Sequence, residues 1–588
     1  MIARPLAAGG VATTRNRRFF VGDLTMGTLV ASAIAVCVGQ VALAIPAVLN
    51  GLFQLDLGTS ASQLTWISDA FLVPVTLLEL TFGVLGDLFG RRKLLVGGAL
   101  LLALGELISV LTPGASAATE TRVLVLWVGQ ALAGIGAAAI FPTSLAIVAA
   151  ATHNARERGR VISVYAAALS TGGFVSPVLG GALAKLHWGS DPNASWRWAF
   201  VVVMVLALGS AAFSALRAQD SSAPAGRSLD WPGQITIAVG LFALLFAVIQ
   251  GPTAGWGSTQ VLGGFAIAVV FMAAFIATEH RTRSPLLRLE LFRNRAFAIT
   301  AFVTVVGMFA FLGTAYTSSI RLSAIQGFSP LKTSLAFVLL QGFTLVLLPV
   351  ISYLMPRVNP RWLLGGGFAL IAAGDFWASR LPIDHLSIVP MIAPLTLVGV
   401  GFAFAVSSVT AVAVNTVRIH LAGMASATTS LLRDFGFTMG PAIVGAIALS
   451  RAASTIQEKL AGSPRLQHAV NGFYGSVAKA PAAERPKLAE AVAAVKSGPL
   501  GANGVPATAT LPNGHSVPLN PLHETAFHAL GSAYSFGYVI CGVAAGLSAL
   551  LVLLVLKADA HHDADELAEV EAQAFVAPEP ERELVGVA

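Results

Sequence analysis

The chain has 588 residues, of which 55% are hydrophobic and only 11% are charged, whereas soluble domains carry about 25% charged residues. This composition excludes an ordinary soluble protein and predicts an integral membrane protein. The net charge of +7 does not indicate nucleic-acid binding, because Lys and Arg gather at the ends of apolar runs, where membrane topology requires them.

Apolar segments of about 20 residues span a bilayer, and counting them predicts fourteen membrane helices. We expect these at 24–50, 62–86, 93–112, 122–150, 160–186, 196–216, 232–251, 259–279, 296–321, 332–355, 361–381, 388–415, 422–450 and 530–556. An even number places both termini on one side. Most of the 36 Lys and Arg residues then fall in the segments on that side, so the positive-inside rule predicts cytoplasmic termini.

The stretch from Gly83 to Lys93, between the second and third spans, combines one acid, three bases and three glycines. We expect Asp87 to pair with a base or to cap a helix N-terminus, where negative charge is favoured. The pattern G-x-L-x-D-x-x-G-R-R-K resembles the cytoplasmic signature between the second and third helices of the major facilitator superfamily. An ordinary cytoplasmic loop accounts for the bases but not for the spaced glycines. The resemblance implies a conformational gate made by Gly83, Asp87, Gly90, Arg91 and Arg92.

An internal repeat appears when Arg92–Gly98 is laid on Arg361–Gly367. Transporters are commonly built from such repeats, with the substrate site at their interface. The expected fold is therefore an all-α membrane protein of the major facilitator type, with two six-helix halves and two inserted helices. The expected parts are a first half at 1–216, a linker and two inserted helices at 217–295, a second half at 296–556 and a cytoplasmic acidic tail at 557–588.

Residues 451–528 form a predicted outer loop far longer than any other. Within it, Pro486 to Val495 has the pattern of a helix, Asn513-Gly514 is typical of a hairpin turn, and Pro499 to Pro506 is expected to be flexible. Loops of this length are usually functional or disordered. We expect a partly ordered cap with one helix, and a tolerated insertion without function is the alternative.

Acidic residues inside predicted membrane helices are the candidate coupling groups, because charges there are costly and default to functional hypotheses. Burial favours the protonated form of a carboxyl group, so a carboxylate that binds either a proton or a cationic compound would couple the two fluxes. A structural salt bridge is the alternative for each acid. Arg433 and Asp434 are adjacent, so we expect them to lie on different helix faces with separate partners. The candidates are Asp69, Glu79, Glu106, Asp375, Asp434 and Arg433.

Two further stretches resemble the fourteen-helix, QacA-like drug:H+ antiporters of this superfamily. Trp66 to Phe71 is similar to their W-x-x-D-x-Y stretch, which makes Asp69 the strongest candidate acid. The fifth span resembles their G-x-x-x-G-P-x-x-G-G motif, with Ser176 in place of one glycine; generic small-residue packing is the alternative. The matched positions are Gly172, Pro177, Gly180 and Gly181.

Two positions depart from that family pattern. Cys37 stands where many relatives have a first-span acid, and Gln130, in the fourth-helix motif with Gly134, stands where they have an arginine thought to assist proton transfer. Proton coupling would then be rearranged, for example around Arg122 or Arg433. Cys37 and the second cysteine, Cys541, both lie in apolar runs, so we expect them to pack rather than to form a disulfide.

The expected function is proton-coupled efflux of amphipathic, cationic drugs or toxic compounds across the bacterial inner membrane by an antiporter. A carrier of the same fold that exports one metabolite, lipid precursor or self-made antibiotic is the first alternative. A membrane sensor or enzyme is the second, although the sequence lacks a metal-spaced His or Cys cluster, a P-loop or a Ser-His-Asp context. We therefore expect no enzyme activity, cofactor or metal. The expected partners are a small amphipathic substrate, protons and the bilayer, without nucleic acid, for a monomer.

Overall fold

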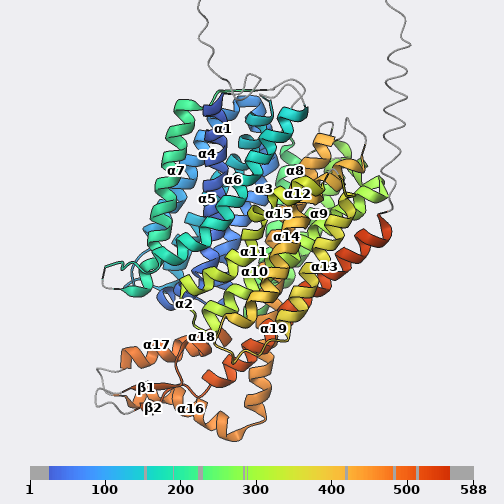
Figure 1. The fold of residues 1–588 in the computed structure, drawn as a ribbon. Coiled ribbons are helices and arrows are strands. Elements are labelled where there is room, and N and C mark those ends of the chain that lie inside the picture. The colour runs from blue at the N-terminus through green and yellow to red at the C-terminus, as the bar shows by residue number, and fades with distance from the viewer. Residues whose placement is uncertain are drawn as a thin grey trace, which may run out of the picture.

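The computed structural model describes residues 25–150, 155–189, 191–222, 229–282, 285, 287, 289–355, 357–417, 422–480, 485–510 and 516–556. Long helices form one bundle, and a small domain lies at one end of it (Figure 1). We call this the small-domain end. The opposite end, where α1 begins, is called the terminal end.

The first half of the bundle is built from helices that stop at identifiable signals. For example, Ser60 and Gln63 form a capping box at the start of α3, and Gly90, with a φ of 104°, separates α3 from α4. The elements are α1 (Met26–Ala44), η1 (Ile45–Val48), α2 (Asn50–Leu57), α3 (Ala61–Phe89), α4 (Arg91–Val110), α5 (Thr119–Ala150), α6 (Ala155–Leu183), η2 (Pro192–Trp196) and α7 (Arg197–Arg217).

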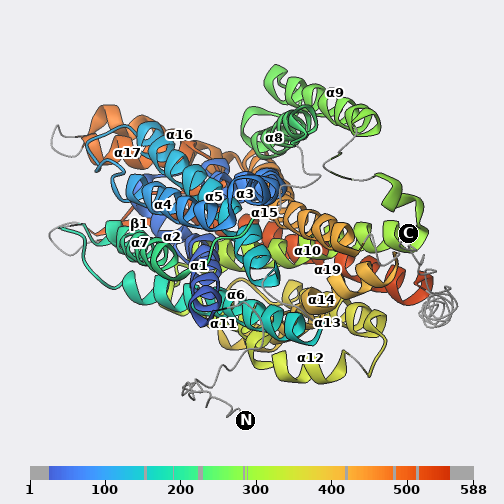
Figure 2. The ribbon, with the colours of Figure 1, turned by 90° about the horizontal axis from the view of Figure 1, so that it is seen from above.

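Two inserted helices follow, α8 (Trp231–Ala254) and α9 (Thr259–Arg281). They lie outside the bundle, where α8 packs against both α3 and α15 (Figure 2). The second half then contains η3 (Leu289–Arg293), α10 (Arg295–Ser319), the π-helical η4 (Ile320–Ile325), α11 (Pro330–Val346), α12 (Leu348–Leu354), α13 (Pro360–Ser379), α14 (Val389–Asn415), α15 (Ala422–Ala461) and α19 (His523–Val555).

Among the described residues, twelve helices are long and apolar enough to cross a membrane, and the bent pair α11–α12 is a thirteenth candidate. The 20-residue α13 corresponds to the remaining predicted span, 361–381, and packs against both α14 and α19. The predicted spans 24–50 and 332–355 are not uniform α-helices. In the first, α1 passes into the 3₁₀-helix η1, which contains Pro46. The second bends by 45° next to Pro349.

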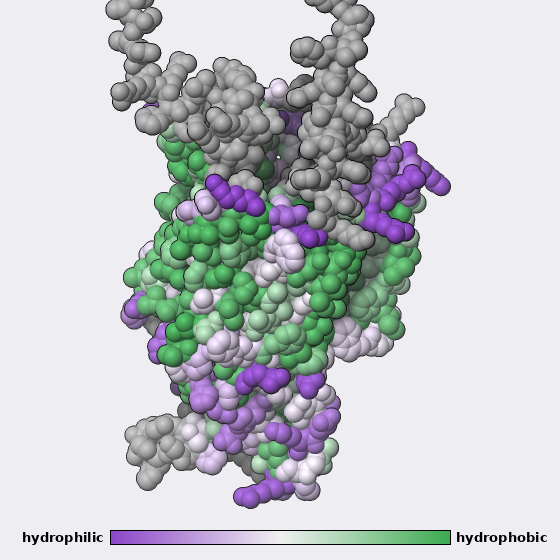
Figure 3. Space-filling model, turned by 45° about the vertical axis from the view of Figure 1, so that its right-hand side comes forward, coloured by the Kyte–Doolittle hydropathy of each residue, from purple (hydrophilic) through white to green (hydrophobic). Residues whose placement is uncertain are grey.

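On the face shown in Figure 3, apolar side chains form a broad band across the bundle, with polar residues above and below it. On α9, for instance, Val269 and Val270 are 70% and 62% exposed. Such a surface is stable only against lipid. The protein is therefore a multi-pass membrane protein.

The internal repeat predicted from the sequence is confirmed by equivalent helix contacts. A side chain on Gly98 of α4 would lie 2.8 Å from the carbonyl oxygen of Gly136 on α5. A side chain on Gly367 of α13 would lie 2.6 Å from that of Gly401 on α14. Residues 98 and 367 are separated by the same 269 positions as Arg92 and Arg361. The two halves thus use the same close helix approach at the same place.

The small domain comprises α16 (Pro464–Lys479), α17 (Arg485–Lys496), α18 (Pro499–Gly504) and the antiparallel strands β1 (Thr508–Thr510) and β2 (Ser516–Pro518). The predicted helix at 486–495 and the hairpin are confirmed, although the Asn513-Gly514 turn lies outside the described residues. The hydrophobic core of the domain, in which Phe473, Val492 and Ala526 are buried, joins it to α19.

Two expectations about this region were wrong. The segment 499–506 is not flexible. Residues 499–504 form α18, in which Leu500 is buried, and the carbonyl groups of Ala502 in α18 and of Val505 just after it accept hydrogen bonds from the Asn520 side chain. The domain also has more than one helix, since α16 packs on α17. In addition, α15 continues to Ala461, past its predicted end at residue 450.

Candidate functional site

The predicted gate lies at the junction of α3 and α4. Arg91 Nη2 lies 2.7 Å from Asp87 Oδ1, which confirms that Asp87 pairs with a base. Both side chains are largely buried, and the Arg91 backbone N–H donates to the carbonyl of Ser221. Arg92 donates from its backbone N–H to Asp220 and from its side chain to the carbonyl of Ala215. The turn therefore holds the end of α7 and the start of the linker.

The remaining glycines of this turn allow close packing on α5. A side chain on Gly86 would lie 3.0 Å from Thr143 Cγ2, and one on Gly83 would lie 3.6 Å from Pro142. A side chain added at Gly90 would lie 2.9 Å from the Asp220 carboxylate. Its positive φ is a second reason for glycine there.

The motif on α6 brings this helix close to both halves of the protein. Gly172 packs on the α1 backbone, because a side chain added there would lie 2.5 Å from the carbonyl oxygen of Cys37. Ser176 donates a hydrogen bond to the carbonyl of Val41 on the same helix. On another face, Gly181 would approach Leu331 of α11 to 2.8 Å. Gly180 faces η1, and Pro177 lies within the helix. The small residues thus permit the close approach that the sequence predicts.

The fourth-helix motif faces other helices of the first half. The Gln130 side chain donates to Ser109 Oγ on α4 at 3.1 Å. Gly134 lies against the α3 backbone at Phe71. Cys37 and Cys541 are free thiols, as expected.

Asp69 lies on α3 and is fully buried. Neither carboxylate oxygen has a hydrogen-bond partner among the described residues. Asp69 is 18 residues from Asp87 on one continuous helix, which is about 27 Å along the axis. A buried carboxyl group without a partner is unusual, so Asp69 stays a candidate coupling group.

Glu79, Asp434 and Arg433 form a cluster across the seam between the halves. Glu79 on α3 interacts with both residues of α15. Arg433 Nε donates to Asp434 Oδ1 at 2.9 Å. The expectation that Arg433 and Asp434 need separate partners was wrong, because the long arginine side chain folds back onto its neighbour. Tyr165 of α6, which no sequence pattern indicated, also interacts with this cluster.

Glu106 and Asp375 lie inside the halves instead. Glu106 is on α4, which packs chiefly on α5 and α7, and neither of its carboxylate oxygens has a partner among the described residues. Asp375 is on α13 and accepts a hydrogen bond from Thr314 of α10 at 2.7 Å. Both are fully buried. The six candidate acids and bases therefore do not form one site.

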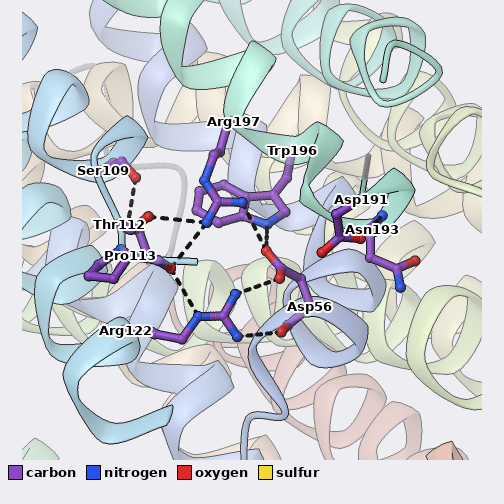
Figure 4. Close-up of polar contacts among 9 residues, drawn as sticks. All are labelled: Asp56, Ser109, Thr112, Pro113, Arg122, Asp191, Asn193, Trp196 and Arg197. Carbon is purple, nitrogen blue, oxygen red and sulfur yellow. Dashed lines mark hydrogen bonds and ion pairs between the residues drawn. The ribbon is translucent and has the colours of Figure 1, made fainter. Parts of the chain in front are cut away.

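A charged network that no sequence pattern indicated fixes α2 to the first half (Figure 4). Asp56 Oδ1 lies 2.5 Å from Arg122 Nη2, and its Oδ2 lies 3.0 Å from Arg197 Nη1. Trp196 Nε1 donates to the same carboxylate at 2.7 Å. The elements that carry these groups are distant in sequence, so spacing alone could not reveal the network. Arg122 is therefore paired with Asp56.

The opposite face of α2 contacts the second half and the small domain. Asn50 Nδ2 donates to Ser319 Oγ at 2.9 Å, and Gln54 Nε2 donates to the carbonyl of Leu500 on α18 at 2.9 Å. Asn503 of α18 in turn donates to the carbonyl of Ala324 on η4 at 3.1 Å. These contacts close the small-domain end of the bundle.

A metal site is absent from the described residues, in which no group of three or more His, Cys, Asp or Glu side chains is placed to hold an ion.

A family profile described as the Major Facilitator Superfamily matches residues 30–441. The chain is 28% identical over 417 residues to the multidrug resistance protein Stp of Mycobacterium tuberculosis, covering 71% of this chain and 73% of that one. It is 25% identical to the tetracenomycin C resistance and export protein of Streptomyces glaucescens, covering 92% and 93%.

A third relative is the puromycin resistance protein pur8 of Streptomyces alboniger, 26% identical, with 69% of this chain and 78% of that one covered. Among solved structures, the bacterial homologue of the human lysosomal transporter Spinster, inward-facing and occupied, aligns with a TM-score of 0.54 at 14% identity. That alignment covers 90% of this chain and 95% of the other. At this identity the likeness concerns the fold alone.

Proposed function

The chain belongs to the Major Facilitator Superfamily, and on this premise we propose that it exports amphipathic, cationic compounds in exchange for protons. The relatives carry names that denote multidrug resistance, antibiotic resistance and antibiotic export, which supports drug efflux. The proton coupling and the preference for cations rest on the buried acids of the membrane helices.

The observation that carries the proposal is the position of Glu79 and Asp434. They approach each other from α3 and α15, and therefore from the two halves that must move apart at one end in alternating access. Thr76 and Thr438, one turn away, join the same two helices at 2.8 Å. A proton or a cation bound between two carboxylates relieves their repulsion. Competition between the two ligands would couple their movements.

In the proposed orientation the protein spans a bacterial inner membrane, and its terminal end faces the cytoplasm. The described residues at that end include Arg91 and Arg92 of the gate and the neighbouring Lys93, and the positive-inside rule favours cytoplasmic bases. The small domain is then outside, where it covers the exit. Its contacts with α2 and η4 must break for the outer end to open.

The experiment is transport in proteoliposomes. Vesicles with an acidic lumen, in which the cytoplasmic end faces outward, should accumulate ethidium and other cationic dyes, and dissipation of the pH gradient should stop accumulation. Accumulation that ignores the gradient would refute proton coupling. Accumulation of neutral and anionic compounds at the same rate would refute the preference for cations.

An exporter of one antibiotic is the second candidate function. It is favoured by the similarity to the tetracenomycin C resistance and export protein, which aligns over 92% of this chain and is named for a single compound. Transport of one member of a chemically broad panel, with the others excluded, would select this candidate.

A further inference from the structure

Two hydroxyl groups from opposite halves meet at the small-domain end of the seam. Thr65 Oγ1 on α3 and Tyr316 OH on α10 are 2.8 Å apart, and each residue is 5% exposed. Thr65 Oγ1 also donates to the carbonyl of Ala61 at 3.1 Å. A hydroxyl has one proton and two acceptor lone pairs. The pair can therefore bond with Tyr316 as donor, or with Thr65 as donor after it turns away from Ala61.

These hydroxyl groups line a small cavity, together with Ser62 of α3, Pro252 of α8 and Gly445 of α15. Its volume of about 10 Å³ is close to that needed by one water molecule. Drug-sized ligands occupy pockets of about 300–1,000 Å³, so the cavity is far too small for a substrate. Ser62 is the second residue of α3, which places the cavity next to the outer surface.

Asp69 lies one helical turn from Thr65 on α3 and interacts electrostatically with Tyr316. Residues four apart on a helix have Cβ atoms about 5–6 Å apart. One water molecule that bonds to a group on each side spans about 5.5 Å. One water molecule placed between them would join the hydroxyl pair to the carboxyl group of Asp69, whose two oxygens have no partner among the described residues.

Titratable and charged groups lie on most of the helices that pack against α3, the helix that carries Asp69. The inserted helix α8 has none, and Arg122 on α5 is paired with Asp56. On α15, Arg433 and Asp434 interact with Glu79. The remaining groups on these elements are Cys37 on α1, Arg91, Arg92, Lys93 and Glu106 on α4, Glu120 on α5, Arg451, Glu458 and Lys459 on α15, and Tyr534 on α19 beside Tyr316.

We propose that Thr65 and Tyr316 form the route by which protons pass between the outer water and Asp69. A hydronium ion in the cavity gives a proton to Thr65 Oγ1 while Thr65 passes its own proton to Tyr316. Tyr316 then passes its proton through one water to the Asp69 carboxylate. Only O–H bonds form and break, and one positive charge moves from the cavity to neutralise Asp69.

The route ends at Asp69 and does not continue to the cytoplasm. Glu79 is ten residues further along α3, about 15 Å towards the terminal end. There the Thr76–Thr438 contact and the Glu79–Asp434 cluster close the seam. The inference rests on the proposed proton coupling, and it adds the residues that deliver the proton.

The test compares two transport modes of the full-length protein in proteoliposomes. Ethidium accumulation driven by a pH gradient requires net proton movement, whereas exchange of labelled for unlabelled ethidium at equal pH does not. Tyr316→Phe and Thr65→Val remove one hydroxyl each. We expect each to lower gradient-driven accumulation at least about tenfold, as expected for loss of a positioned proton carrier, and to leave exchange within about twofold of the parent.

A third variant fills the cavity without removing a hydroxyl group. An added side chain on Gly445 would lie 3.1 Å from the Tyr316 ring and 3.4 Å from Thr65 Oγ1. Gly445→Ala should therefore also lower gradient-driven accumulation and leave ethidium exchange unchanged. Tyr538→Phe is the matched control for tyrosine, because its hydroxyl bonds to Ser318 within the second half at 2.9 Å. Thr304→Val is the matched control for threonine, since its buried hydroxyl donates to the carbonyl of Thr300 within α10 at 2.7 Å. Both controls should retain gradient-driven accumulation.

Unchanged gradient-driven accumulation in Tyr316→Phe and Thr65→Val would overturn the proton route. Equal loss of both modes would overturn it too, because the pair would then be a contact that holds the halves together. If the parent itself ignores the pH gradient, the proposed function fails, and this result is distinct from a coupled parent with unaffected variants.

Discussion

Glu106 on α4 and Asp375 on α13 occupy equivalent positions in the two halves of the protein. Residues 106 and 375 differ by 269, as do 92 and 361, the first residues of the matched repeat segments. Both acids are fully buried, and each has at least one carboxylate oxygen without a partner among the described residues. They differ in that Asp375 accepts a hydrogen bond from Thr314.

We expect Glu106→Gln and Asp375→Asn to slow gradient-driven export less than Glu79→Gln does. The helices that carry them pack within their own halves, and an amide oxygen can still accept the Thr314 hydrogen bond. Export rates of the three variants, normalised to the amount of protein inserted, provide the comparison. Complete loss of export in either repeat variant would make that acid a carrier of the transported proton.

Asp87→Asn should abolish export while the protein still inserts into the membrane. The substitution removes the ion pair with Arg91 that joins the end of α3 to the start of α4. Dye export is measured in cells together with the amount of protein in the membrane fraction. Lys93→Gln, which changes an exposed charge two residues further on, is the control and should retain export. Normal export by Asp87→Asn would mean that the turn is ordinary topology.

Asp69→Asn should lower export of dicationic dyes about tenfold, the effect of losing about 1.4 kcal/mol of interaction with the ligand. The carboxylate is buried with no partner among the described residues, so it is free to interact with a second positive charge. Efflux is measured for a dicationic and a monocationic dye of similar size. Equal rates for the variant and the parent with the dicationic dye would assign Asp69 a structural role.

Asp56→Ala should destabilise the first half by about 3–5 kcal/mol, because it leaves two buried arginines without their counter-charge. Arg122 and Arg197 are each 4% exposed. Thermal unfolding of the purified protein in detergent measures the change. Asp384→Ala, at an exposed carboxylate that lies 3.6 Å from His528, is the control. An unfolding temperature equal to that of the parent would show that the network contributes little to stability.

Replacing residues 465–520 by a short Gly/Ser linker should slow export without abolishing proton-coupled transport. Short connections suffice for antiparallel helices, and the domain bonds to both halves through Gln54 and Asn503, so its removal changes the balance between open and closed outer ends. Export of several substrates is compared with that of the parent. Unchanged rates would make the domain a tolerated insertion, whereas complete loss at normal expression would make it part of the transport path.

The sequence predicted the helix positions well because a bilayer imposes a length and an apolar composition on each span. The change to a 3₁₀-helix at Pro46 and the bend next to Pro349 were not predicted, since proline within a membrane helix is often accommodated without a sharp bend. The order in α18 was also missed. It depends on Asn520, which follows the hairpin and donates to the carbonyls of Ala502 in α18 and of Val505 just after it, and composition does not reveal such contacts.

The candidate site was predictable only in part, for a similar reason. An acid inside an apolar run is visible in the sequence, and all five candidate acids prove to be buried. Their partners are not visible, because they lie on helices far away in the chain. Asp434 and Glu79 are 355 residues apart, and Thr65 meets a tyrosine 251 residues away. Uncharged groups such as Tyr316 carry no signal of their own within a membrane helix.

Simultaneous recording of ethidium and proton movement in proteoliposomes, with a pH-sensitive dye in the lumen, tests whether the protein exchanges cations for protons. For the parent, each accumulation of ethidium should coincide with loss of protons from an acidic lumen. Glu79→Gln should stop proton movement and gradient-driven accumulation together, because the cluster across α3 and α15 then loses a titrating group. Ethidium accumulation without proton movement in the parent would show that export is not coupled to protons, and unaltered coupling in Glu79→Gln would show that Glu79 does not carry the proton.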